Sequence, residues 1–251
     1  MISEVIKTHK RAIIPYVTAG LPSLATTGAI IRALAEVGAA AIEIGIPFSD
    51  PMADGPVLQK ASKSALSAGF RMEPLFDHLA SWSATLGVPL IIMSYINPLM
   101  RRGFEATVQR LKESGIAGLI IPDLPSNADG FYELTCSLGL DLIRLVAPTT
   151  PMERQSEVVS QCSGFVYAVA VKGVTGARKA LPDDIVHQVQ TLKSMTDLPV
   201  CVGFGISTAS QVDNILTFAD GVIVGSFLME RIMQAEDPVA AAGDTLLRLS
   251  G

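Results

Sequence analysis

Short apolar runs rich in β-branched residues alternate along the chain with segments in which apolar residues recur at helical spacing. Glycine, proline and acidic residues follow most of the short runs, as expected for strands that end in turns. Eight runs predict strands, at residues 12–18, 41–46, 89–95, 117–122, 141–147, 164–171, 199–203 and 220–225. Eight strands separated by helices predict an α/β fold of the (β/α)8 TIM-barrel class.

The spacing of these elements also predicts the domain organisation. A chain of 251 residues fits one such barrel, and no linker or low-complexity stretch divides it, so residues 1–251 are expected to form a single domain. Residues 1–10 are expected to form a helix that closes the barrel floor. Residues 172–182 follow the sixth strand and combine glycines with basic residues, which predicts a mobile lid.

Composition narrows the possible partners and the compartment. Hydrophobic residues make up 49% of the chain, which fits strands buried on both faces, and the net charge of −5 without a long basic run argues against nucleic acid. No apolar stretch has the length of a membrane span, and the first residues lack the apolar core of a signal peptide. Cys136, Cys162 and Cys201 match no disulfide or zinc spacing. We therefore expect a cytoplasmic protein with reduced thiols, no membrane and no metal site.

One acid stands inside an apolar strand. In "AAIEIGI", Glu43 shares a face with Ala41 and Gly45, whereas three isoleucines occupy the other face. The small residues predict an opening inside the barrel, and burial there would raise the pKa of the carboxyl group. A raised pKa suits a general acid or base near neutral pH. The alternative is a structural ion pair between Glu43 and an internal arginine or lysine.

Two further acids, Asp50 and Asp54, lie in the loop after this strand, within "FSDPMADGP". Prolines stiffen the loop by fixing φ, and the spacing is not that of an EF-hand. An isolated loop aspartate usually forms an Asx-turn or caps a helix, which is the default interpretation of Asp50. Asp54 follows the second strand at the end of the barrel where active sites of this fold lie.

Glycine-rich turns follow the sixth, seventh and eighth predicted strands. "GVTG" contains Gly176, "VGFGIS" contains Gly205, and "VGSFL" contains Gly225 and Ser226. Glycine lets backbone N–H groups converge on an anion, and the last two loops of this fold often bind phosphate. A substrate that carries phosphate is the expectation, although a single glycine turn is often only a tight turn.

These residues resemble the α subunit family of tryptophan synthase over nearly the whole chain. The resemblance rests on "PYVTAG", "EIGIPFSDPMADGP", "MSYINP", "IPDLP", "VAPTT", "GVTGAR", "GFGIS" and "GS". It implies a (β/α)8 barrel that cleaves indole-3-glycerol phosphate to indole and glyceraldehyde 3-phosphate without a cofactor of its own. The chain departs from the family at Leu21, where aspartate is frequent, and at residues 170–172, where small polar residues are usual.

The resemblance also implies roles for individual residues. Glu43 and Asp54 match the catalytic glutamate and aspartate, and the phosphate-binding positions match Gly176, Gly205, Gly225 and Ser226. The implied substrate pocket includes Tyr16, Tyr95, Val146, Tyr167, Val169 and Phe204. Thr175 is expected to reach Asp54 when the lid closes. The implied partner is a β subunit that uses pyridoxal phosphate, contacted through a loop that includes Pro47 and Asp50, in an α2β2 complex.

Three other functions remain as alternatives. A metal-dependent sugar-phosphate epimerase would need histidine ligands at strand ends, but His78 and His187 fall in helical patterns. A Schiff-base aldolase would use Lys172, which is out of phase with the residues expected inside the barrel. A catalytically silent regulatory subunit would not need both Glu43 and Asp54.

Overall fold

The eight predicted strands form a closed parallel barrel in the order of the chain, with β8 paired to β1. The computed structural model describes residues 2–125, 129–170, 183–203 and 205–251. The strands are β1 Ile13–Thr18, β2 Ile42–Gly45, β3 Leu90–Met93, β4 Gly118–Ile120, β5 Asp141–Val146, β6 Val166–Val169, β7 Val200–Gly203 and β8 Gly221–Val224. The prediction of a TIM barrel is therefore confirmed.

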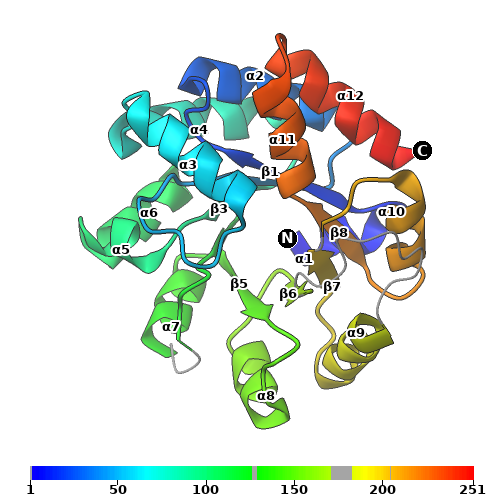
Figure 1. Cartoon of the computed structure of the whole chain (residues 1–251). Coiled ribbons are helices and arrows are strands. Elements are labelled where there is room, and N and C mark those ends of the chain that lie inside the picture. Colours follow the sequence, from blue (N-terminus) through cyan, green and yellow to red (C-terminus); the bar gives the residue numbers. More distant parts are fainter. Residues whose placement is uncertain (1, 126–128, 171–182, 204) are drawn as a thin grey trace.

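The described helices surround the barrel on its outer side, except for α1, which lies across the floor of the barrel (Figure 1). They are α1 Ile2–Thr8, α2 Leu24–Glu36, α3 Pro56–Ser67, α4 Met72–Leu86, α5 Ile96–Met100, α6 Phe104–Glu113, α7 Asp129–Ser137, α8 Met152–Ser160, α9 Asp183–Met195, α10 Ala209–Leu216, α11 Ser226–Gln234 and α12 Pro238–Ser250. The larger apolar core lies between these helices and the strands. No described helix combines the length and the apolar character needed to cross a membrane.

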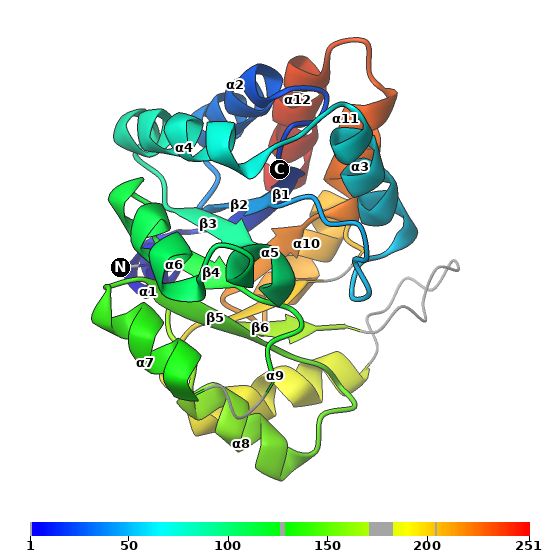
Figure 2. The same ribbon diagram turned by 90° about the vertical axis from the view of Figure 1, so that its left-hand side faces the viewer.

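A second apolar cluster fills the barrel interior at the end where the strands begin. Ile2 and Ile6 of α1 are fully buried there against interior residues such as Ile91 and Ile143. Figure 2 shows α1 at one end of the molecule, opposite the loop that leads from β2 into α3. Because α1 fills the floor, the space for a ligand lies at the carboxyl ends of the strands.

Local sequence signals set the start of several helices. Ser23 caps α2 by accepting a hydrogen bond from the N–H of Thr26. Thr208 and Gln211 form a reciprocal capping box at α10, and Asp237 caps α12. The caps of α2 and α10 place these helix starts after the loops of β1 and β7, where helix N-termini can face a ligand, whereas α12 follows α11.

Candidate active site

Glu43 lies inside the barrel on β2, with its neighbours Tyr16 on β1 and Ile91 on β3 in register. Its side chain is 1% exposed, and its Oε1 has no hydrogen-bond partner among the described residues. Burial raises the pKa of this carboxyl group to about 8. No ion pair joins Glu43 to an arginine or lysine in the described part of the chain, so the structure gives no support to the structural ion pair.

The glycine two positions after Glu43 makes room for a tyrosine. A Cβ at Gly45 would lie 1.9 Å from the Tyr16 Oη, so only glycine fits while this ring crosses β2. Gly203 on β7 has the same relation to Tyr167, whose Oη would lie 2.4 Å from an added Cβ. Gly45, one of the small residues that suggested an opening, therefore accommodates the Tyr16 ring, and Gly203 accommodates the Tyr167 ring.

Asp54 lies in the loop between β2 and α3, and hydrogen bonds fix that loop. Its backbone N–H donates to the carbonyl of Pro51 at 3.1 Å, and its carbonyl accepts from Gln59 Nε2 at 2.9 Å. Partial burial raises the pKa of the Asp54 carboxyl to about 6, and a hydrogen bond from Tyr95 opposes this rise. Asp54 is therefore mostly ionised at neutral pH, whereas Glu43 is mostly protonated.

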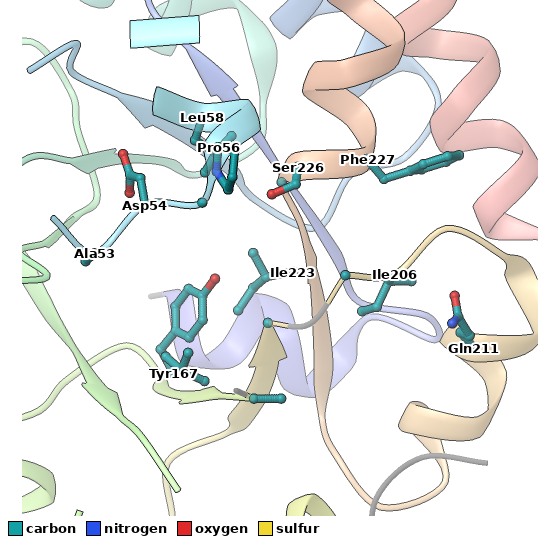
Figure 3. A pocket seen from close by; sticks show the side chains of 16 residues that line it. Ala53, Asp54, Pro56, Leu58, Tyr167, Ile206, Gln211, Ile223, Ser226 and Phe227 are labelled. Carbon is teal, nitrogen blue, oxygen red and sulfur yellow. The ribbon is translucent and has the colours of Figure 1, made fainter. Parts of the chain in front are cut away.

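A cavity of about 570 Å³ opens at the carboxyl ends of β6, β7 and β8 beside Asp54. Figure 3 shows Asp54, Tyr167 and Ser226 reaching its wall from three different elements. Six of the predicted site residues line it: Asp54, Tyr167, Val169, Gly205, Gly225 and Ser226. Their convergence agrees with the place expected for the active site of this fold.

Glu43 does not itself line this cavity, but electrostatics places it close to the lining tyrosine. Burial raises the pKa of Tyr167, and the negative charges of Glu43 and Asp54 raise it further. Burial and then Asp54 raise the pKa of Tyr16, and Glu43 contributes less. Because both acids act on both phenols, Glu43 and Asp54 belong to one electrostatic environment.

The glycine and serine at the start of α11 give the cavity an anion-binding character. Gly225 precedes the helix and Ser226 is its first residue. First-turn N–H groups of a helix lack partners within the helix and attract anions, aided by the helix dipole. Gly205 lines the same cavity from the loop after β7, and a side chain there would meet nothing within 4 Å.

Some predicted site residues lie elsewhere. Tyr16 is 5% exposed and Tyr95 contacts Asp54 from outside the cavity lining. Val146 lies on the helix-facing side of β5, out of phase with the interior residues Ile143 and Leu145. The structure thus does not bring Val146 to the cavity. Phe204, Thr175, Gly176, Lys172 and the predicted lid at 172–182 lie outside the described residues.

Sequence reasoning did not assign the other ten lining residues to the site, namely Ala53, Gly55, Pro56, Leu58, Ala170, Gly203, Ile206, Gln211, Ile223 and Phe227. Leu58 and Phe227 belong to the first turns of α3 and α11, so the position of each helix start was the available signal. Gln211 accepts hydrogen bonds from the N–H groups of Ser207 and Thr208, and the pattern T-x-x-Q marks such a capping box in the sequence.

The rest of the β2–α3 loop is divided between buried and exposed residues. Pro47 is buried, whereas Asp50 is exposed and accepts a hydrogen bond from the Ser49 hydroxyl. Met52 is 91% exposed, the most exposed of the large hydrophobic residues described. A single exposed apolar side chain is common on protein surfaces, so Met52 by itself does not indicate an interface.

A closed parallel barrel with two acids and a glycine-rich helix start at its carboxyl end defines a (β/α)8-barrel enzyme. A family profile described as "Tryptophan synthase alpha chain" matches residues 2–248. The chain belongs to the tryptophan synthase alpha chain family, whose members are carbon–carbon lyases of tryptophan biosynthesis.

Individual relatives agree with this assignment. The tryptophan synthase alpha chain of Carboxydothermus hydrogenoformans is 46% identical over 224 residues, which cover 89% of this chain and 84% of the relative. The tryptophan synthase A-subunit of Pyrococcus furiosus superposes with a TM-score of 0.89 at 34% identity, over 95% of this chain and 97% of that one. Tryptophan synthase of M. tuberculosis, in an aminoacrylate-bound form, gives a TM-score of 0.88 at 31% identity, over 99% and 97% of the two chains.

Proposed function

We propose that this chain cleaves indole-3-glycerol phosphate to indole and glyceraldehyde 3-phosphate, with Glu43 as the proton donor and acceptor and Asp54 as the stabilising anion. The observation that carries the proposal is the environment of Glu43, a buried carboxyl group with an unpartnered oxygen and a pKa of about 8. Such a group holds a proton at neutral pH and can deliver it and take one back.

The chemistry is a retro-aldol cleavage in which indole is a poor leaving group. Protonation of indole C3 by Glu43 gives an indolenine-like intermediate that carries positive charge near N1. The resulting Glu43 carboxylate then accepts the proton of the glycerol hydroxyl next to the breaking bond. Because one residue acts first as an acid and then as a base, a pKa close to the working pH serves both steps.

Asp54 has the complementary role, since it carries charge and transfers no proton. Its pKa of about 6 leaves it ionised at neutral pH, and it can accept a hydrogen bond from the indole N1–H. A fixed anion at this position stabilises positive charge as it develops in the transition state. The phosphate of the substrate would bind at the other side of the cavity, against Gly205, Gly225 and Ser226.

We also propose a β subunit as the partner, with the pyridoxal phosphate of the complex held by that subunit. A solved relative is a tryptophan synthase complex of Pyrococcus furiosus. The exposed Asp50 and Met52 offer a contact surface in the β2–α3 loop, whereas Pro47 is buried and would shape that loop from inside. Free thiols at Cys136, Cys162 and Cys201 support a reducing, cytoplasmic compartment.

The deciding experiment is an assay of the purified chain with indole-3-glycerol phosphate. We expect indole release by the unmodified chain and its near loss in Glu43→Gln, while Glu36→Gln, at an exposed glutamate on α2, keeps full activity. Absence of cleavage by the unmodified chain, alone and with β subunit, would instead identify a silent regulatory subunit.

A further inference from the structure

A second cavity, of about 160 Å³, lies on the outer side of the barrel and shares no lining residue with the active site. Its walls come from residues 121–125 after β4, from β5 and from α8, which lies beside β5 in Figure 1. The lining residues are Ile121, Pro122, Leu124, Pro125, Arg144, Leu145, Thr150, Arg154 and Val158. Two arginines and a threonine thus line the same small recess.

Arg144 is the unusual member of this cavity, because it is a cation on a barrel strand. It is only 4% exposed, and it faces the helices because the flanking Ile143 and Leu145 pack inside the barrel. Its Nη2 donates to the carbonyl of Pro125 at 2.7 Å, and its Nη1 donates to Gln161 Oε1 at 3.2 Å. Both acceptors are neutral, and no carboxylate forms an ion pair with Arg144 within the described ranges.

A buried cation with neutral partners is costly. Burial lowers the pKa of Arg144, which shows that the surroundings disfavour its charge. A guanidinium remains protonated nonetheless and carries five N–H donors, of which the two hydrogen bonds described use two. The remaining donors and the charge call for an anionic acceptor, and the cavity is the space beside them.

Arg154 supplies a second cation at the same cavity from the first turn of α8. It is exposed, and neither Glu153 nor Glu157 on its own helix forms an ion pair with it. Two guanidiniums that share a recess repel each other unless an anion lies between them. Planar guanidinium forks match the oxygen geometry of phosphate and related oxyanions.

We propose that the cavity between β5 and α8 is a binding site for a small oxyanion of the phosphate class, held by Arg144 and Arg154 with the Thr150 hydroxyl. The size is suitable, because 160 Å³ is several times the roughly 30 Å³ that one water occupies in the liquid. Arg144 is a fixed partner, since its two hydrogen bonds hold it in place. Arg154 is exposed and can close over the anion.

The test is a calorimetric titration of the full chain with inorganic phosphate in a low-salt buffer free of other oxyanions. Two binding equivalents are expected, of which glycerol 3-phosphate displaces the one in the active-site cavity. Arg144→Leu should abolish the other equivalent, and Arg154→Leu should weaken it by about tenfold or more, because each removes charge-assisted hydrogen bonds. Arg32→Leu, at an exposed arginine on α2, is the matched control and should keep both.

The phosphate that binds in the active-site cavity, which glycerol 3-phosphate displaces, serves as an internal check that each variant is folded. A single equivalent in the unmodified chain, fully displaced by glycerol 3-phosphate, would overturn the proposal. So would two unchanged equivalents in both Arg144→Leu and Arg154→Leu. If Arg144→Leu fails to fold, the exposed Arg154→Leu variant decides the outcome alone.

Discussion

The hydroxyl of Tyr95 accepts a hydrogen bond from the backbone N–H of Ala53 at 2.9 Å, one residue before Asp54. The same tyrosine donates to the Asp54 carboxylate and so lowers its pKa. One side chain just beyond β3 therefore fixes both the position and the ionisation of the acid in the neighbouring loop. The ring of Phe48 stacks on Tyr95 with centroids 5.2 Å apart and supports it.

Tyr95→Phe should raise the pKa of Asp54 above about 6, because the hydrogen bond that stabilises the carboxylate is lost. If ionised Asp54 is needed for cleavage, the acid limb of the kcat/KM profile should move upward by about one pH unit. Phe48→Leu removes the stacking but keeps the hydroxyl, and should leave the limb near its original pH. If the acid limb of the kcat/KM profile stays at the same pH in Tyr95→Phe, this hydrogen bond does not contribute to catalysis.

Substitutions of Glu43 and Asp54 should affect activity in different ways, because one acid transfers protons and the other supplies charge. Glu43→Gln keeps the size of the side chain but cannot exchange a proton, so turnover should fall by about 10²–10⁴-fold or more while a substrate analogue still binds. Asp54→Asn loses the charge and should be severely impaired, whereas Asp54→Glu keeps a displaced charge and should retain more activity. Steady-state assays together with analogue titrations check this. Normal turnover by Glu43→Gln would remove Glu43 from the mechanism.

Glu43 should also make stability depend on pH. Its pKa is about 8 in the folded chain against 4.5 for an ordinary exposed glutamate, so the folded state holds the proton more tightly than the unfolded state. The free energy of unfolding therefore falls as pH rises from about 4.5 to 8, by about 5 kcal/mol at most. Urea unfolding at about pH 5 and pH 8 should show Glu43→Gln gaining relative stability at the higher pH. Parallel curves for the two proteins would contradict the raised pKa.

Gly45→Ala should disturb the active site through Tyr16, because the new Cβ would overlap the tyrosine Oη. Overpacking of this kind costs about 1–3 kcal/mol. Combining Gly45→Ala with Tyr16→Leu removes the overlapping atoms and should cost less than the sum of the single changes. A double-mutant cycle by urea unfolding measures this coupling, and additive costs would show that the chain relaxes without moving Tyr16.

Ser226→Asp should separate helix stability from phosphate binding. A carboxylate in the first turn of α11 favours the helix dipole by about 0.3–1 kcal/mol, so the protein should unfold at an equal or higher temperature. The same charge repels a substrate phosphate, so KM should rise strongly. Ser226→Asn, which is similar in shape and uncharged, is the control. An unchanged KM in Ser226→Asp would place the phosphate away from α11.

The alternation of apolar runs and helical patterns was enough to predict the barrel, and the polar residue in "AIEIGI" was enough to predict the buried Glu43. Val146 was expected in the pocket from the family resemblance, and the apolar pattern of its strand offers no check on that expectation. Apart from Asp141 and Arg144, both faces of β5 are apolar, so hydrophobicity does not determine which residues face inward. The contact between Tyr95 and Ala53 joins residues 42 positions apart and depends on loop geometry that no local pattern encodes.

The two cavities could not be predicted from the sequence for a related reason. Arg144 stands out in its strand, but its acceptors, Pro125 and Gln161, lie in separate connections whose approach depends on the packing of α8. The active-site residues Leu58 and Phe227 likewise reach the cavity only because α3 and α11 begin where their loops bring them to one end of the barrel. Sequence spacing shows which loops meet, whereas the shape of the space between them follows from side-chain packing.

The pairing of β1 with β8 has a consequence for synthesis of the protein. Ile13 on β1 pairs with Val222 on β8. More than 200 further residues must therefore be synthesised before β8 can cover this edge of β1. At about 5–20 residues per second, a ribosome leaves that edge unpaired for on the order of ten seconds or more. Contacts so distant in sequence also slow folding, and an unpaired apolar strand edge invites association with other chains. The nascent chain should therefore depend on chaperones until β8 has left the ribosome.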